Sequence, residues 1–237
     1  MSDHLVHIGA VIVNGILFDP KNEERLRTMD LANLLKSVPR LFDLLEEREI
    51  DYVLVGGIAM LVYVDGRNTQ DIELIVSRED LSKLPEIKIE NGNRDFTCGW
   101  LEDLRIDFLF ANNELFEKVR KKHATKKRFA NREVMCATVE GLVLLKLFAL
   151  PALYRQGHFD RVRTYEKDVA DLLDRYRPDL QPLLAELAKF MLPNDAEELR
   201  KIVIEIKERI AKSHERFTGD QQRRPTCQTK PGFSMDC

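Results

Sequence analysis

The segment VLVGGIAMLVYVDGRNTQDIELIV, residues 53–76, decides the fold because it places charge inside what is otherwise an apolar strand. Its first run, VLV, predicts a strand that ends at Gly56 and Gly57. The run IAMLVYV predicts a helix that starts at these glycines, and DIELIV predicts a second strand after the polar loop DGRNTQ. The segment therefore predicts a strand, a glycine turn, a helix and a second strand in succession.

Two carboxylates, Asp71 and Glu73, lie in the second of these strands. Residues two apart on a strand project from the same face of the sheet, so the two side chains should project together. Neighbouring carboxylates repel and are costly to desolvate unless a cation lies between them. A divalent metal resolves this conflict, and oxygen ligands suit Mg²⁺, which binds carboxylates together with substrate phosphates. The pattern therefore favours a magnesium site.

Two further features of the sequence fit this site, and each has a structural alternative. Asp107 is again a charge in an apolar run, LRIDFLF, and we expect it to lie beside Asp71 and Glu73. The alternative is that Asp107 caps an edge strand or pairs with Arg105. The glycine pair lets a backbone approach a phosphate closely and starts a helix whose free amides attract an anion. The alternative there is a purely structural turn.

The rest of the chain predicts an α+β protein with a short mixed sheet, flanking helices and a C-terminal helical domain. Residues 1–20 contain two apolar runs around Asn14 and Gly15, a favoured hairpin pair, and predict an N-terminal hairpin. Helical spacing of leucines from Asp30 to Leu45 predicts two short helices, because Pro39 breaks or restarts the helix.

We expect three further regions beyond the hairpin. Residues 21–137 form the α+β core, and residues 138–217 are periodic and predict helices. Residues 218–237 lack periodicity and are rich in polar residues, which predicts a disordered tail.

Composition indicates an ordinary globular protein that does not bind polyanions as a whole. Of its 237 residues 44% are hydrophobic and 32% charged, and the formal net charge is −3. We find no run of eighteen apolar residues and no signal-peptide pattern at the start, which predicts a cytoplasmic protein without membrane contact. The four cysteines form no C-x-x-C pair, which favours reduced thiols.

The order of these motifs resembles the nucleotidyltransferase superfamily related to DNA polymerase β, and more closely its minimal and abortive-infection (AbiEii-like) branches. Those branches often read G-G-x-A and then R-x-T-x-D-x-D, matched here by GGIA at 56–59 and RNTQDIE at 67–73. A helical lysine and a later Lys-Asp are matched by Lys146 and by KD at 167–168. The resemblance spans about residues 50–176. Two positions depart from it, because Ile58 stands where many members have Ser or Thr, and Glu73 replaces the commoner Asp.

The resemblance implies phosphoryl transfer assisted by two Mg²⁺ ions, and it assigns a role to each motif. Asp71 and Glu73 would bridge the ions, and Asp107 would join the ion that activates the acceptor hydroxyl. Gly56, Gly57, Arg67, Thr69 and Lys146 would bind the nucleotide, and Asp168 would orient Lys146. Lys146 could instead extend its stem along an apolar helix, and Asp168 could belong to a solvated helix face.

A basic run, EKVRKKHATKKRF at residues 117–129, carries seven lysines and arginines. It is either a solvated surface or a contact for the phosphates of an RNA or DNA acceptor. In the second interpretation the acceptor-binding residues are Lys121, Lys122, Lys126 and Lys127.

The sequence therefore predicts a magnesium-dependent enzyme that moves a nucleoside monophosphate from an NTP to a hydroxyl acceptor. The acceptor would be an RNA end, a protein or a small molecule, and the branch resemblance suggests a toxin-antitoxin or phage-defence setting. The alternative is a non-catalytic module that keeps the fold, binds nucleotide and acts through a protein partner. The sequence leaves the oligomeric state open.

Overall fold

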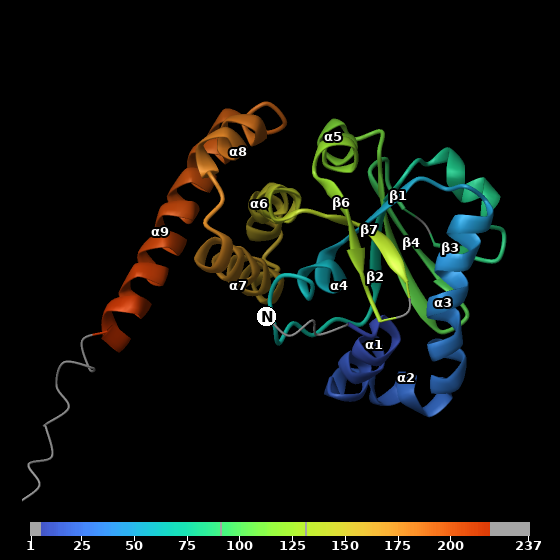
Figure 1. Ribbon diagram of the computed structural model, residues 1–237. Coiled ribbons are helices and arrows are strands. Elements are labelled where there is room, and N and C mark those ends of the chain that lie inside the picture. The colour runs from blue at the N-terminus through green and yellow to red at the C-terminus, as the bar shows by residue number, and fades with distance from the viewer. Residues whose placement is uncertain (1–5, 91, 131, 219–237) are drawn as a thin grey trace, which may run out of the picture.

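The computed structural model describes residues 6–90, 92–130 and 132–218, which form one mixed sheet with helices on both sides (Figure 1). The seven strands of the sheet lie in the order β3-β4-β5-β2-β1-β7-β6. The strands are β1 (Tyr52–Val55), β2 (Ile72–Val76), β3 (Lys88–Ile89), β4 (Phe96–Leu101), β5 (Leu104–Phe110), β6 (Ala124–Arg128) and β7 (Glu133–Ala137). The helices are α1 (Ile8–Leu17), α2 (Glu23–Thr28), α3 (Leu31–Glu47), α4 (Gly56–Met60), α5 (Glu114–Lys122), α6 (Val139–Arg155), α7 (Phe159–Tyr176), α8 (Leu180–Leu187) and α9 (Pro193–Thr218), with 3₁₀ turns η1 (Pro20–Asn22) and η2 (Glu79–Lys83).

The strand pairing confirms the α+β class with a mixed sheet. Strands β2 and β5 run parallel, as do β1 and β7, whereas β1–β2, β3–β4, β4–β5 and β6–β7 are antiparallel. The centre of the sheet is apolar on the side away from the carboxylates, where Ile72, Ile106 and Phe108 are fully buried. This packed layer fixes the register of β2 against β5.

The expected N-terminal hairpin is wrong, because residues 8–17 form helix α1. Its buried residues are Ile8, Ile12, Gly15 and Ile16, a helical spacing that places one face on the core. Asn14 and Gly15 lie inside this helix and form no hairpin turn. An added Cβ at Gly15 would lie 2.1 Å from the carbonyl oxygen of Thr69. The glycine therefore serves a close helix-to-loop approach instead of a tight turn.

Helix α3 is also a correction, since it runs unbroken through Pro39 where two helices were expected. Proline removes one hydrogen bond, to the carbonyl of Leu35, and costs about 3 kcal/mol inside a helix. Leu35 is 47% exposed, so water can reach this turn, whereas Leu34, Leu41 and Leu45 are fully buried. Burial of the apolar stripe outweighs the proline.

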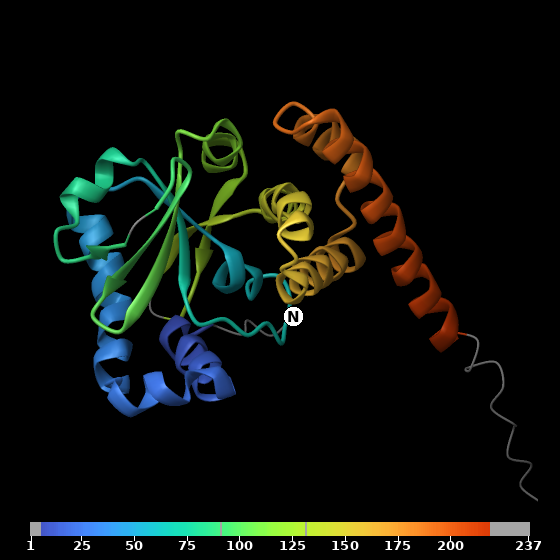
Figure 2. The ribbon, with the colours of Figure 1, turned by 180° about the vertical axis from the view of Figure 1, so that it is seen from behind.

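The last strand ends at Ala137, and the chain from there to Thr218 is helical, as predicted. The side chain of Thr138 caps α6 by accepting a hydrogen bond from the amide of Gly141 at 3.3 Å. Helices α6 and α7 lie across the sheet from α3, and α9 packs on their outer side (Figures 1 and 2). The expected tail falls on residues 219–237, outside the described part of the chain, and no helix within that part combines the length and apolarity of a membrane span.

Candidate active site

The glycine turn is shaped around two side chains from the neighbouring segment. Gly56 has φ +65°, a left-handed conformation that favours glycine, and it turns the chain from β1 into α4. A Cβ at Gly56 would lie 1.4 Å from Oε2 of Glu73, and one at Gly57 would lie 2.5 Å from Oγ1 of Thr69. The amide of Gly57 donates a hydrogen bond to Oε2 of Glu73 at 2.9 Å. The pair thus makes room for Glu73 and Thr69, and one amide at the helix start is already used.

Glu73 and Asp107 project from the same face of the sheet. Glu73 and Asp107 are direct partners across the parallel strands β2 and β5, and partners in register share a face. Asp71 lies just before β2, which begins at Ile72, and its charge acts on both Glu73 and Asp107. Oδ1 of Asp71 accepts a hydrogen bond from Oγ1 of Thr69 at 3.0 Å, and Oδ1 of Asp107 accepts one from Nε of Arg105 at 3.0 Å. Asp107 therefore lies with the other acids and also makes the ion pair considered as its alternative.

Two of the three acids, Glu73 and Asp107, have raised pKa values. Burial raises the pKa of Glu73 above its usual range, and the charge of Asp71 raises it further. Burial also raises the pKa of Asp107, against the opposing hydrogen bond from Arg105. Desolvation and like charge both disfavour the ionised form of a carboxyl group, and a bound cation would reverse this. A cation bound beside these carboxylates would therefore stabilise their ionised forms.

The carboxylates do not converge on one point in this conformation. Within the described residues, no group of three or more His, Cys, Asp or Glu side chains is arranged to hold a metal ion as it stands. Glu73 turns toward Gly57 and Asp107 toward Arg105, since unneutralised acids take the nearest donors and avoid one another.

A buried ionic cluster lies behind the carboxylates. Nζ of Lys146 on α6 is 2.6 Å from Oδ2 of Asp168 on α7, and Nε of Arg67 is 3.1 Å from Oδ1 of the same carboxylate. Lys146 is 4% exposed and Asp168 is 1% exposed, so neither is a solvated surface residue. The positive charge of Lys146 acts to lower the pKa of Glu73, so the cluster lies within electrostatic reach of this acid. The loop before β2 and the first two C-terminal helices therefore meet at this site.

Two residues of α7 belong to this environment although the sequence motifs did not single them out. The ring of Tyr165 has Nζ of Lys146 4.4 Å from its centroid, and the pKa of Tyr165 is raised by burial and by the charge of Glu73. The charge of Arg161 acts to lower the pKa of Asp107. Arg161, Tyr165 and Asp168 have the spacing i, i+4 and i+7, which places them on one helix face. That spacing is a signal that sequence analysis could have used.

The basic run lies away from the carboxylates. Its second half is the edge strand β6, which is separated from β2 by β7 and β1. Several of its cations have partners: Lys118 pairs with Glu186, Lys121 lies 2.7 Å from Glu117, and Lys127 stacks on Tyr63 at 4.9 Å from the ring centroid. Lys122 and Lys126 are exposed. The run is therefore part helix and part sheet edge, and several of its charges are paired.

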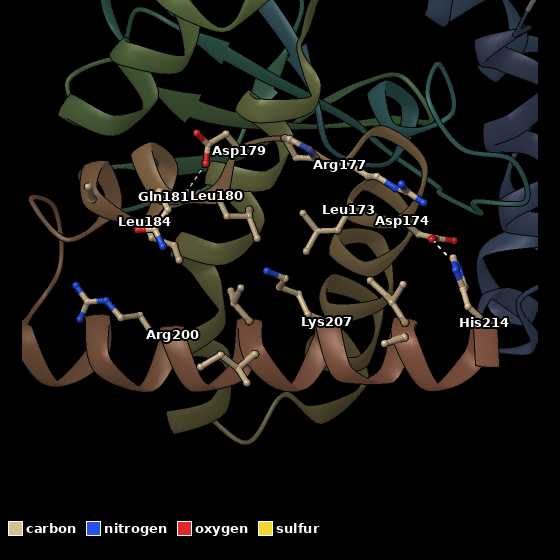
Figure 3. A pocket seen from close by; sticks show the side chains of 16 residues that line it. Leu173, Asp174, Arg177, Asp179, Leu180, Gln181, Leu184, Arg200, Lys207 and His214 are labelled. Atoms are coloured by element: carbon tan, nitrogen blue, oxygen red, sulfur yellow. Dashed lines mark hydrogen bonds and ion pairs between the residues drawn. The ribbon is translucent and has the colours of Figure 1, made fainter. Parts of the chain in front are cut away.

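A groove lies away from the candidate site, between α9 and the segment where α7 ends and α8 begins (Figure 3). It has a volume of about 730 Å³, and its lining includes the apolar Leu173, Leu184 and Val203 and the cationic Arg177 and Lys207. The candidate site residues are absent from its described lining. Its size alone does not connect it with the chemistry of the acids.

Comparisons with known proteins found structural likenesses only. No family model matches the sequence, and no curated protein matches it. The solution structure of the antibiotic-resistance factor ANT(2'')-Ia is similar over 79% of this chain and 100% of that one, at 13% identity and a TM-score of 0.47. An antigenic nucleotidyltransferase-like protein from Paracoccidioides brasiliensis is similar over 69% of this chain and 89% of that one, at 15% identity and a TM-score of 0.42. A crystal structure of ANT(2'')-Ia with adenylyl-2''-tobramycin is similar over 73% of this chain and 95% of that one, at 14% identity and a TM-score of 0.42.

One of these structures is described as nucleotidyltransferase-like, and another contains an adenylylated antibiotic. The abortive-infection branch is not among the similar structures named here. Likeness this distant does not by itself assign a substrate to the chain.

Proposed function

We propose that this protein is a nucleotidyltransferase that moves a nucleoside monophosphate from an NTP to a hydroxyl acceptor and releases pyrophosphate. The observation that carries the proposal is the register of β2 against β5, which sets Glu73 directly beside Asp107, with the charge of Asp71 acting on both. Neighbouring acids beside a glycine turn lower the stability of the fold through desolvation and repulsion, and a bound cation would offset this cost. Such destabilised groups are typical of functional sites.

The donor set fits magnesium. Carboxylate oxygens are the ligands that Mg²⁺ prefers, and a cation would relieve the repulsion that raises the pKa values of Glu73 and Asp107. Asp71 and Glu73 would hold one ion, and Asp107 would join them at a second. When bound, such ions neutralise phosphate charge and lower the pKa of a hydroxyl nucleophile. Before binding, Glu73 must exchange its contact with Gly57, and Asp107 its contact with Arg105, for the ion.

The cations of the site would bind the triphosphate. Arg67 and Lys146 already share Asp168, which fixes both side chains and leaves donor capacity on each. Arg161 and Arg105 lie near Asp107 and are candidates for the acceptor side of the site. Thr69 holds Asp71 by its hydroxyl, so we assign it to positioning of that acid as well as to nucleotide binding. Preorganised charge of this kind supplies most of the catalysis in phosphoryl transfer.

The acceptor and the setting rest on the sequence resemblance and the basic run. An RNA end, a protein and a small molecule all remain within the proposal, and a toxin-antitoxin or phage-defence role in the cytoplasm follows from the branch resemblance alone. The non-catalytic alternative has one observation in its favour: Ile58, at the position of a common Ser or Thr, is 1% exposed and packs in the core. It offers no hydroxyl to a phosphate.

The test is transfer of label from each α-³²P-labelled NTP to total RNA or to cell extract with Mg²⁺. We expect one NTP to label an acceptor, and we expect EDTA and the Asp71→Asn variant each to abolish labelling. Glu133→Gln is the matched control, since Glu133 is an exposed carboxylate on β7 and should not affect transfer. Nucleotide binding without transfer to any acceptor would contradict the enzymatic proposal and favour the non-catalytic module.

A further inference from the structure

The loop that carries Arg67, Thr69 and Asp71 is held in place by the N-terminal segment of the chain. Residues 67–71 have no helix or strand of their own, and β2 begins only at Ile72. Helix α1 reaches this loop at Gly15, where an added Cβ would lie 2.1 Å from the carbonyl oxygen of Thr69. Three residues proposed for nucleotide or metal binding therefore sit on a loop that packs directly against a helix outside the recognised motifs.

One side chain of the loop is bound at both ends by this segment. Nε2 of Gln70 donates to Oδ2 of Asp19 at 2.8 Å, and Oε1 of Gln70 accepts from Nδ2 of Asn22 at 2.9 Å. The two partners are themselves fixed, because Oδ1 of Asp19 accepts from the amide of Lys21 at 3.0 Å and Nδ2 of Asn22 also donates to the carbonyl of Ile16 at 3.1 Å. Gln70 is thus clamped between the end of α1 and the turn η1.

Gln70 directly precedes Asp71 in the chain, so the position of Gln70 constrains the position of the Asp71 backbone. Thr69, on the other side of Gln70, donates its hydroxyl hydrogen bond to Asp71 and fills the space left by Gly57. A movement of Gln70 would shift both neighbours together. Small displacements of groups that position substrate can cost on the order of a hundredfold in rate.

We propose that Gln70 is a positioning residue, and that Asp19, Asn22 and Gly15 form with it a brace that sets Arg67, Thr69 and Asp71 for nucleotide binding. The proposal rests on the proposed function for its consequence in catalysis. The brace acts through Asp71 and Thr69, and Gln70 itself contacts neither nucleotide nor metal. It gives residues 8–22 a role that the expected hairpin did not provide.

The chain offers a reciprocal exchange that tests the brace. In Gln70→Glu a carboxylate faces the carboxylate of Asp19 and has no proton to donate to it, so the contact is lost and replaced by repulsion. Adding Asp19→Asn restores a donor, because the amide introduced at position 19 can donate to the carboxylate introduced at position 70, while Asn22 still donates to the other oxygen of that carboxylate. Asp19→Asn alone completes the cycle. Asp19 accepts from the amide of Lys21 with one oxygen and from Gln70 with the other, so an asparagine that keeps the bond from Lys21 turns its NH₂ group toward the NH₂ group of Gln70. This single variant should therefore also loosen the loop, and only the double variant should restore it.

Three measurements on the full-length variants decide the proposal. Hydrogen exchange at the amides of residues 66–71 should be at least tenfold faster in Gln70→Glu than in wild type, with amides of β4 unchanged. The affinity for a non-hydrolysable NTP with Mg²⁺ should fall about tenfold. Transfer should fall further, since Asp71 is misplaced in the reaction as well as in binding. The double variant should return all three values to within about threefold of wild type.

Unchanged exchange and affinity in Gln70→Glu would overturn the proposal, and so would a double variant no better than the single one. If Gln70→Glu does not fold, Asn22→Ala removes the other end of the clamp and should raise exchange in the same loop. Hydrogen exchange needs no activity, so it separates a failure of the brace from a failure of the proposed function. Wild-type protein that binds no nucleotide would refute the proposed function even where exchange supports the brace.

Discussion

At the scale of single residues, we expect Gly56 to be especially sensitive to the addition of a single methyl group. It combines a left-handed backbone with direct contact to Glu73, so an alanine there meets both strain and a clash. Gly66 shares the left-handed conformation, with φ +75°, but a Cβ there would meet nothing within 4 Å. The pair separates the cost of the backbone from the cost of displacing Glu73.

We therefore expect Gly66→Ala to lower the free energy of unfolding by about 1 kcal/mol, the cost of a left-handed non-glycine residue. Gly56→Ala should cost more than this and should also weaken Mg-NTP binding, because Glu73 must leave its place. Denaturant unfolding and calorimetric titration measure the two effects. Equal stability and equal nucleotide affinity in the two variants would show that Glu73 does not depend on the glycine turn.

We expect substitution of Asp168 to be strongly destabilising, because its carboxylate pairs with both Lys146 and Arg67. Asp168→Asn leaves both cations without their counter-charge, and breaking a buried ion pair in this way costs about 3–5 kcal/mol. Lys146→Met removes one cation and leaves Asp168 paired with Arg67, so it should destabilise less. Thermal unfolding of the two variants makes the comparison. A smaller loss in Asp168→Asn than in Lys146→Met would contradict this arrangement of the cluster.

At the scale of elements, the sequence predicted the strands in which apolar and polar residues alternate clearly. The alternation in DIELIV and LRIDFLF indicated strands, and β2 and β5 do pair with Glu73 beside Asp107. Asp71 lies just before β2, outside this register. The N-terminal helix was missed because Asn14-Gly15 is a strong local turn signal, and only the packing of Gly15 against Thr69 explains the glycine. Local chemistry favoured a hairpin, and the tertiary contact decided otherwise.

Contacts between distant segments could not be predicted in this way. Arg67 and Asp168 are 101 positions apart, and Gln70 and Asp19 are 51 apart, so no window of sequence contains either pair. The resemblance supplied Lys146 and Asp168 and implied that Asp168 orients Lys146, and the structure adds Arg67 to the same carboxylate. Arg161 and Tyr165 lay on a readable helix face with Asp168, but their relevance depended on what that face contacts.

The basic element formed by the end of α5 and β6 carries its own prediction. Replacing Lys121, Lys122, Lys126 and Lys127 with Gln should weaken RNA binding and flatten its dependence on salt, if this edge contacts phosphates. We expect a smaller effect from Lys121 and Lys127, which already have partners. The same number of lysines replaced on α9 and before it, at Lys189, Lys201, Lys207 and Lys212, controls for net charge. Equal binding by both variants would show that β6 is only a solvated edge.

At the scale of the whole molecule, the site joins the two halves of the fold. Arg67 pairs with Asp168 across them, and the hydroxyl of Tyr176 on α7 donates to the carbonyl of Tyr63 at 2.9 Å. Lys118 on α5 pairs with Glu186 on α8 at a third point. A nucleotide that contacts both Lys146 and the carboxylates would bind the assembled molecule only, and should therefore raise its unfolding temperature as ligand concentration rises.

The central claim is that Asp71, Glu73 and Asp107 act together in nucleotidyl transfer, and Asp107→Asn tests it most directly. Asn keeps the size of the side chain and removes its charge, while Asp71 and Glu73 remain for the ion that carries the triphosphate. We expect transfer to fall by about a hundredfold or more, the scale of losing one strong transition-state contact, with the affinity for a non-hydrolysable Mg-NTP largely kept. Transfer by Asp107→Asn at the wild-type rate would contradict the account.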